Sequence, residues 1–257
     1  MNGPRRQPPV RDLPPVAERY RVRYRKTGRM RFSSARDFQR ALERAIRRGG
    51  VPVAFSAGFS PHPRISYTNT VQTGVASEAE YLEVGLTRAV DPARLRQVLA
   101  EGMPDGFIVA EVVRVCSDDF ANRLQASRWR IELPDVDPAQ AEQAVSVFES
   151  LTQAPVERLT KRGRTTVDVR SAITAISVVA NGESVAGDQP CAILQLVVRH
   201  VTPSVRPVDV LTALERSAGL PQSQAPRICR LEQGPLSGDG VTIGDPFDPD
   251  RPAASCA

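Results

Sequence analysis

The sequence predicts an α+β protein made of two tandem ferredoxin-like domains, each with its elements in the order β-α-β-β-α-β. A chain of 257 residues, 41% hydrophobic and 25% charged, is long enough for two domains of ordinary size. Segments that alternate between apolar and polar residues, as strands do, are interspersed with segments of helical periodicity. Both ends are rich in proline and lack either period, which predicts disordered tails. The expected organisation is a tail (1–18), a first domain (19–116), a linker (117–127), a second domain (128–234) and a tail (235–257).

The first domain opens with a strand at 20–25, where arginine alternates with tyrosine and valine, and Met30–Phe32 are expected to extend it after a turn. Ser34 and Asp37 have the spacing of a helix N-cap and its capping-box partner, and Gly49 ends the helix. Apolar residues at helical spacing should face the core, namely Phe38, Leu42, Ala45 and Ile46. The remaining expected elements are strands at 51–55, 65–70, 81–86 and 107–115 and a helix at 92–102.

The second domain repeats this pattern with little sequence similarity to the first. Asp137-Pro138 and Pro207 open its two expected helices, which end near Thr152 and at Gly219. A looser α+β unit is the alternative, because the middle strands of this half are harder to count. The expected strands are 129–133, 156–161, 165–169, 173–179, 192–199 and 227–232.

Positive charge is concentrated in the first quarter of the chain. Residues 1–70 hold 16 Lys+Arg and 4 Asp+Glu, a balance of +12, whereas the whole chain has a net charge of +5. The expected helix contributes a row of arginines opposite its apolar face. A basic patch of this kind commonly binds phosphate, and the alternative is a solvated arginine-rich surface.

The loop Gly58-Phe59-Ser60-Pro61-His62-Pro63-Arg64 carries one of the two histidines. Because each proline fixes φ and restricts the residue before it, the loop is expected to present His62 rigidly. Three interpretations stay open for this side chain: holding the loop in place, contacting a ligand, or acting as an acid or base.

A second basic segment, Lys161-Arg162-Gly163-Arg164, is followed by Arg170. A tight turn at Gly163 would direct amide groups and guanidinium groups at an anion, and a plain hairpin tip is the alternative. Exposed aromatic rings stack on unpaired bases, and the candidates are Tyr24, Phe32, Phe59 and Tyr67. Core packing is the favoured alternative for all of them except Phe59.

The sequence offers no recognisable cofactor or metal site. The four cysteines are far apart, the two histidines have no metal-ligand spacing, and P-loop, dinucleotide and GxSxG motifs are missing. We therefore expect no cofactor and no metal. The chain also lacks a long apolar run and an apolar signal-peptide core, which predicts a cytoplasmic protein without a membrane partner.

Four segments resemble a bacterial radical-SAM-associated domain of unknown function. They are Phe32–Asp37, Arg44–Arg48, Gly58–Ser66 and Gly74–Leu82. The resemblance covers roughly residues 20–235 and is sharpest over 31–86. In one departure, the family's histidine in its Ser-His-x-Asp start is Ala35 here.

Members of that family occur fused to, or encoded apart from, a cobalamin-binding radical-SAM protein. The resemblance implies an accessory role, in modifying or handling RNA, with RNA or a radical-SAM enzyme as the partner. The loss of the family histidine at Ala35 argues against catalysis by this chain.

The leading functional hypothesis is a non-catalytic RNA-binding or accessory protein. The first alternative is a metal-independent RNA-processing enzyme that uses His62, by analogy with CRISPR repeat-cleaving endonucleases of similar architecture. The second is an adaptor for a radical-SAM enzyme. The candidate binding residues are Arg31, Ser34, Arg36, Asp37, Arg40, Arg47, Arg48, Gly58, Phe59, Pro61, His62, Pro63, Arg64, Lys161, Arg162, Arg164 and Arg170.

Overall fold

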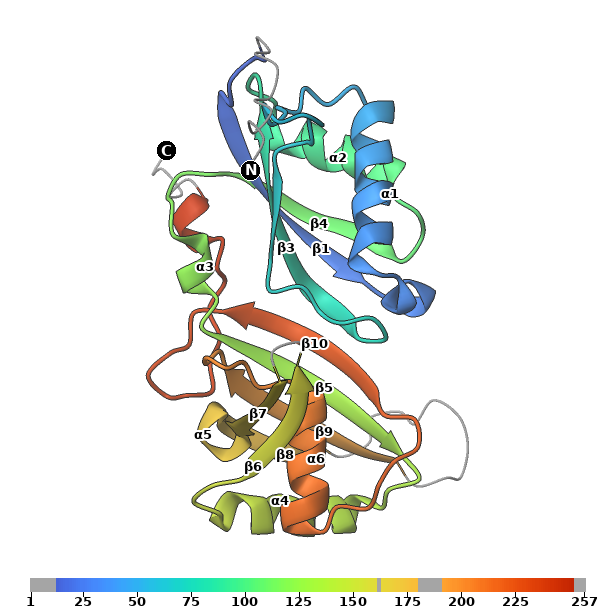
Figure 1. Cartoon of the computed structure of the whole chain (residues 1–257), viewed down its shortest axis with the longest axis vertical. Coiled ribbons are helices and arrows are strands. Elements are labelled where there is room, and N and C mark those ends of the chain that lie inside the picture. The colour runs from blue at the N-terminus through green and yellow to red at the C-terminus, as the bar shows by residue number, and fades with distance from the viewer. Residues whose placement is uncertain (1–12, 161–162, 180–190, 252–257) are drawn as a thin grey trace, which may run out of the picture. The chain divides into compact units, whose positions relative to one another are not determined.

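The computed structural model describes residues 13–160, 163–179 and 191–251 (Figure 1). The fold is α+β, as predicted. The chain divides into two compact units. Unit 1 combines the residues up to Asp118 with those from Phe247 onward, and unit 2 is the continuous stretch Asp119–Pro246.

Unit 1 is an antiparallel sheet with the strand order β4-β1-β3-β2. Both of its long helices cover one face of that sheet (Figure 1). In chain order its elements are β1 (Glu18–Lys26), the 3-10 helix η1 (Gly28–Phe32), α1 (Ala35–Arg48), β2 (Ile65–Thr68), β3 (Ala76–Leu86), α2 (Pro92–Gly102) and β4 (Phe107–Arg114).

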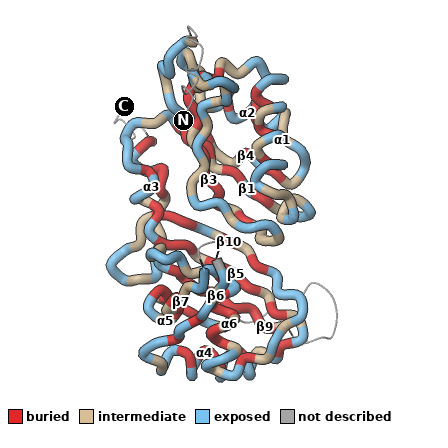
Figure 2. The backbone as a smooth tube through the Cα atoms, in the orientation of Figure 1, coloured by how far each residue is buried: buried red, intermediate tan, exposed pale blue. Residues whose placement is uncertain are grey.

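The core of unit 1 lies between this sheet and its two helices. Figure 2 shows buried residues along β1, β3 and β4. The apolar face of α1 is the predicted one, because Phe38, Leu42, Ala45 and Ile46 are all buried. Phe38 stacks on Tyr24 of β1 with 4.1 Å between ring centroids. The sequence signals that start and orient α1 are therefore confirmed.

The helix-free face of this sheet is covered by Phe247–Arg251, which includes the 3-10 helix η2 (Asp248–Asp250). The ring of Phe247 lies 5.3 Å from that of Tyr81, and the Asp250 carboxylate pairs with the buried Arg21 guanidinium. Arg251 bonds to Glu111. Residues 235–251 thus differ from the predicted disordered tail, since tertiary contacts order them despite their Gly/Asp/Pro-rich composition.

Unit 2 is also an antiparallel sheet, with the strand order β10-β5-β9-β8. Helices α4 and α6 pack on each other, and α4 packs on β8 and β9. A separate hairpin of β6 and β7 is inserted between α4 and β8. The elements are α3 (Phe120–Arg123), β5 (Ala126–Pro134), α4 (Pro138–Ser150), β6 (Pro155–Thr160), β7 (Gly163–Asp168), α5 (Val169–Ala172), β8 (Ile173–Val179), β9 (Cys191–Arg199), α6 (Pro207–Ala218) and β10 (Arg227–Gly234).

Three local expectations differ from the structure. Residues 51–55 form isolated bridges at Val53 and Phe55 rather than a strand, and Pro52, just before Val53, has no N–H to donate. The strand expected to extend to Phe32 gives way to η1. The expected linker 117–127 contains α3 and the start of β5.

Candidate functional site

Helix α1 presents the predicted basic face. The capping box starts the helix: the Ser34 hydroxyl accepts from the Asp37 N–H, and the Asp37 carboxylate accepts from the Ser34 N–H. The Ser34 hydroxyl also donates to the Asp37 carboxylate, at 2.7 Å, and this bond together with that from the Ser34 N–H holds the pKa of Asp37 below its ordinary value. With the apolar residues buried, the helix exposes Arg36, Arg40, Arg44, Arg47 and Arg48.

The arginines of α1 differ from those on the strands of unit 1. Within the described residues, the α1 arginines make no hydrogen bond or ion pair through their side chains. The strand arginines all have carboxylate partners, and they are Arg19, Arg21, Arg23, Arg25 and Arg114. The outer face of α1 is therefore a row of arginines without ion-pair partners in the described structure, and Asp37 acts on Arg40 through its charge alone.

An exposed aromatic residue lies just before this helix. Phe32 is 60% exposed, and the guanidinium carbon of Arg31 lies 4.6 Å from the centre of its ring. Both residues belong to η1, which leads directly to Ser34. Of the predicted site residues, Arg31, Ser34, Arg36 and Asp37 therefore lie within seven consecutive positions.

The loop from Gly58 to Arg64 is closed at its base by backbone hydrogen bonds. The Ser56 N–H donates to the His62 carbonyl at 2.9 Å, and the Arg64 N–H donates to the Ala54 carbonyl at 2.7 Å. Phe59 at its tip is 55% exposed. The imidazole of His62 is exposed and makes no hydrogen bond within the described part of the chain. Pro61 and Pro63 flank it and are half-buried.

The second basic segment lies in the β6–β7 hairpin of unit 2. Lys161 and Arg162 lie outside the described residues. Arg164 is 84% exposed, with 3.8 Å between its guanidinium and the Glu157 carboxylate. Arg170 is instead held by its own unit, because it donates to the carbonyls of Ile173 and Glu149. Its role in the structure is to hold this part of unit 2 together.

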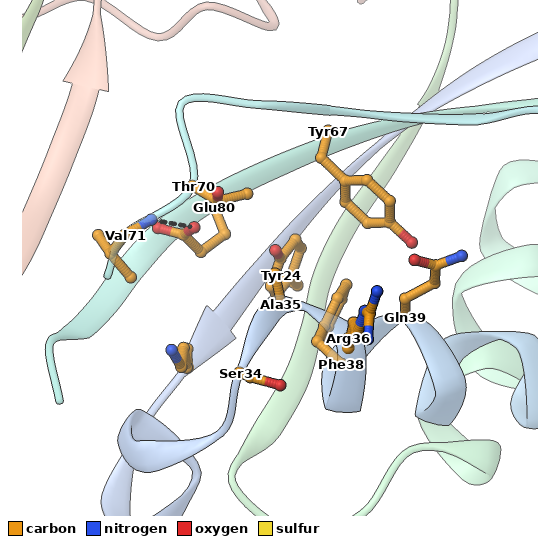
Figure 3. Close-up of a pocket in the computed structure, with 11 residues that line it drawn as sticks. Tyr24, Ser34, Ala35, Arg36, Phe38, Gln39, Tyr67, Thr70, Val71 and Glu80 are labelled. Carbon is orange, nitrogen blue, oxygen red and sulfur yellow. Dashed lines mark hydrogen bonds between the residues drawn. The ribbon is translucent and has the colours of Figure 1, made fainter. Parts of the chain in front are cut away.

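A pocket of about 140 Å³ adjoins the N-terminus of α1 in unit 1 (Figure 3). Arg36, the first arginine of the row on α1, lines this pocket together with the core residues Tyr24 and Phe38. The lining residues come from β1, the start of α1, β2, the segment between β2 and β3, and β3, and they are Tyr24, Lys26, Ser34, Ala35, Arg36, Phe38, Gln39, Tyr67, Thr70, Val71 and Glu80.

Lys26 is the most unusual of these residues, because it is only 7% exposed. No hydrogen bond or ion pair joins its ammonium group to the described residues, although the charge of Glu80 acts on it electrostatically. Burial lowers the pKa of Lys26, and the Glu80 carboxylate opposes that effect. The Glu80 carboxylate itself accepts the Val71 N–H at 3.0 Å.

Tyr67 contributes a second group without a partner. Its hydroxyl is buried and makes no hydrogen bond within the described structure. Burial, together with the charge of Glu43, raises the pKa of Tyr67 well above its ordinary value. The hydroxyl therefore keeps its proton and remains a hydrogen-bond donor.

The sequence did not single out Lys26 or Glu80. A signal for Lys26 was present: along β1, Tyr20, Val22 and Tyr24 are buried in the helix-facing core, and the same period of two continues to Lys26. The loop residues from Gly58 to Arg64 do not line this pocket.

Metal ligands, thiols and long apolar helices bear on the class of site. No group of three or more His, Cys, Asp or Glu in the described ranges is arranged to hold a metal ion. Cys116, Cys191 and Cys229 are free thiols. No helix in the part of the chain that the structure describes is long and apolar enough to cross a membrane.

A protein-family model matches residues 19–207, and its description is an uncharacterized protein conserved in bacteria (DUF2344). Because this match covers more than half of the chain, the protein belongs to the DUF2344 family. A search of the curated proteins finds no match. The family description states no activity, so the function is argued from the site.

Proposed function

We propose that this protein is a non-catalytic RNA-binding accessory factor whose main contact surface is the outer face of α1. The carrying observation is the row Arg36, Arg40, Arg44, Arg47 and Arg48, exposed and without carboxylate partners in the described structure. An exposed guanidinium row of this kind suits the phosphates of a nucleic-acid backbone.

The exposed aromatic rings favour a single-stranded RNA. Phe32 lies beside Arg31 at the start of α1, and Phe59 lies at the tip of the Gly58–Arg64 loop. Unpaired bases stack on such rings, whereas bases within a duplex are not accessible to them. Arg164 in the β6–β7 hairpin is a further exposed contact in the proposal.

We further propose a ferredoxin-like architecture for both units and an association with a radical-SAM system. The first part is supported by the strand orders β4-β1-β3-β2 and β10-β5-β9-β8, combined with β-α-β-β-α-β chain order once the β6–β7 hairpin is set aside. The second part is supported by the sequence resemblance of Gly58–Ser66 and Gly74–Leu82.

The enzyme alternative receives less support from His62. A catalytic histidine is commonly oriented by a hydrogen bond to its second ring nitrogen, and the exposed imidazole has no hydrogen-bond partner within the described residues. The loop is held by the backbone bonds at its base and by a bond from the His62 N–H to the Ser56 hydroxyl, neither of which touches the imidazole. We therefore assign His62 to binding rather than to proton transfer.

The test is the salt dependence of RNA binding, measured by fluorescence anisotropy with a labelled single-stranded oligoribonucleotide. Arg36, Arg40 and Arg47 are changed together to glutamine. If each contacts one phosphate, the slope of log K against log salt becomes shallower by about 2, because one contact on a single strand contributes about 0.7.

The matched control changes Arg88, Arg94 and Arg96 to glutamine, which removes the same charge from exposed positions elsewhere in unit 1. The control should leave the slope close to that of the unmodified protein. Equal slopes for the two triple variants, or no RNA binding at low salt, would refute the proposal.

A further inference from the structure

The pocket beside α1 contains hydrogen-bond donors that the described protein leaves without acceptors. Lys26 is 7% exposed and lines the pocket, yet its ammonium group has no hydrogen bond or ion pair with the described residues. The buried Tyr67 hydroxyl is also without a partner. Leaving the buried Tyr67 hydroxyl unpaired is costly, and the Lys26 ammonium group is a positive charge in the pocket wall without an ion-pair partner in the described structure. Together they point to a ligand that supplies the acceptors.

The N-terminus of α1 adds to this set. The pocket is lined by Ser34, Ala35 and Arg36, the cap and first two residues of a fourteen-residue helix. The Ser34 hydroxyl accepts a hydrogen bond from the Asp37 N–H. The backbone N–H groups of Ala35 and Arg36 have no acceptor within the described structure. Free amides at the positive end of a helix favour an anion, and the Arg36 side chain adds a full positive charge.

Three carboxylates near these donors oppose the binding of an anion. Asp37 is engaged by the capping box, and Glu80 accepts the Val71 N–H. Glu43 acts on Tyr67 through its charge and bonds with Gln39. None of them forms an ion pair with Lys26 within the described part of the chain.

We propose that this pocket binds a terminal phosphoryl group, either at the end of an RNA chain or on a free mononucleotide. The RNA source rests on the proposed function, whereas phosphoryl binding itself does not. Lys26, Arg36 and the helix amides supply donors from β1 and α1, and the Tyr67 hydroxyl, which points toward Gln39 in Figure 3, adds one from β2. A phosphomonoester offers three terminal oxygens to such donors, whereas a carboxylate offers two.

The size of the pocket favours a chain end. Its volume of about 140 Å³ compares with the roughly 30 Å³ that one water occupies in the liquid. That space holds a phosphoryl group with part of its sugar. A phosphodiester within a chain continues on both sides, so a small pocket in the side of unit 1 excludes it.

The experiment compares one short single-stranded RNA with a 5′-phosphate, with a 3′-phosphate and with hydroxyl groups at both ends, by fluorescence anisotropy. Calorimetric titrations with adenosine 5′-monophosphate and with inorganic phosphate form the second arm. We expect a phosphorylated end to bind about ten- to a hundredfold more tightly than a hydroxyl end, as hydrogen bonds to a charged group imply.

Lys26→Met should abolish this preference while keeping the length of the buried chain, and Tyr67→Phe should reduce it. Arg25→Gln is the matched control, because it removes a positive charge from the neighbouring position of β1 that is exposed and paired with Glu78. The control should keep the preference. Tyr67→Phe removes only a hydroxyl and carries the test by itself if Lys26→Met fails to fold.

The outcomes distinguish an RNA end from a free mononucleotide as the ligand of the pocket. They also separate a failure of the pocket proposal from a failure of the proposed RNA binding. Binding of the mononucleotide without any preference among RNA ends supports the pocket and identifies the free nucleotide as its ligand. Mononucleotide binding without any RNA affinity refutes the proposed function and keeps the pocket. Equal affinities for all three RNA forms, with no binding of mononucleotide or phosphate, would overturn the pocket proposal, as would an unchanged preference in Lys26→Met and Tyr67→Phe.

Discussion

The ion pair between Arg21 and Asp250 should be a large contributor to the stability of unit 1. The two side chains are 1% and 0% exposed. Asp250 also accepts the N–H groups of Cys116 at 3.1 Å and Ser117 at 3.3 Å. Arg21 keeps a contact at 3.4 Å with Glu83 when Asp250 is changed. A substitution at Asp250 therefore leaves a buried guanidinium with incomplete compensation.

Removing one partner of a buried ion pair costs about 3–5 kcal/mol. Asp250→Asn keeps an oxygen for the two amides and loses only the charge, so we expect a cost at the lower end, about 3 kcal/mol. Asp250→Ala also leaves the N–H groups of Cys116 and Ser117 without that acceptor, so its cost should lie at the upper end of this range. Replacing both partners by apolar residues, as in Arg21→Met with Asp250→Leu, should recover much of the loss, because no lone charge remains buried.

The assay must report each unit separately. Urea unfolding followed by pulsed hydrogen exchange and mass spectrometry meets this need, with peptides from β1 reporting unit 1 and peptides from β9 reporting unit 2. Trp129 is the single tryptophan and lies in unit 2, so its fluorescence gives an independent signal for that unit. We expect the β1 transition to move to lower urea in Asp250→Asn.

Asp248→Asn is the control for this prediction. The Asp248 side chain is 68% exposed and pairs with Arg251 on the same short segment. Exposed pairs contribute at most about 1 kcal/mol, so this variant should unfold close to the unmodified protein. An Asp250→Asn variant within about 1 kcal/mol of wild type would refute the reasoning.

Two further predictions concern stability. Burial lowers the pKa of His200 in the folded state, so folding favours the neutral ring. The unfolded chain therefore binds a proton at this histidine more readily than the folded protein does. The stability from the neutral ring is fully present above the unfolded pKa of about 6.5 and is lost as the pH falls below that value. Urea unfolding at pH 7.5 and 5.5 should thus show a smaller pH effect in His200→Gln, and an unchanged effect would contradict the assignment. Gly102→Ala places a Cβ 2.5 Å from the Cβ of Ala45. Thermal unfolding should therefore show a loss of about 1–3 kcal/mol in the free energy of unfolding. Gly58→Ala is the control and should show no such loss, because its Cβ meets nothing within 4 Å.

The surroundings of His200 explain why it is structural. Its Nδ1 lies 2.6 Å from the Leu124 carbonyl oxygen and therefore carries the proton. Its Nε2 lies 2.7 Å from the buried Ser127 hydroxyl and accepts from it. Both ring nitrogens of the neutral form are thus satisfied, and a second proton would have to displace this arrangement.

Local signals explain which parts of the fold were predictable. The start of α1 was read from Ser34 and Asp37, and its buried face from Phe38, Leu42 and Ile46, because capping and periodicity act within a few residues. The segment Phe247–Arg251 was not predictable in this way. Its order depends on partners such as Arg21 and Tyr81, far away in the sequence, and composition carries no record of such contacts.

The residues of the candidate site were also predictable only where a local sequence signal places them. The exposed arginines of α1 followed from the helical period, since their positions are set by the apolar face opposite. Lys26 was missed because a single lysine at the end of an alternating strand reads as a surface residue. Its burial depends on α1, β3 and the segment after β2, which the sequence of β1 alone does not encode.

The return of Phe247–Arg251 to unit 1 means that unit 2 is inserted within unit 1 along the chain rather than following it. The amide of Ser117 lies 3.3 Å from the Asp250 carboxylate, so the two chain positions that flank the insertion are neighbours in unit 1. Within unit 2, Arg123 near one end donates to the Pro246 carbonyl at the other. Unit 2 thus has the connectivity of a module placed in a surface loop, and a chain cut after Asp118 lacks the residue that neutralises Arg21.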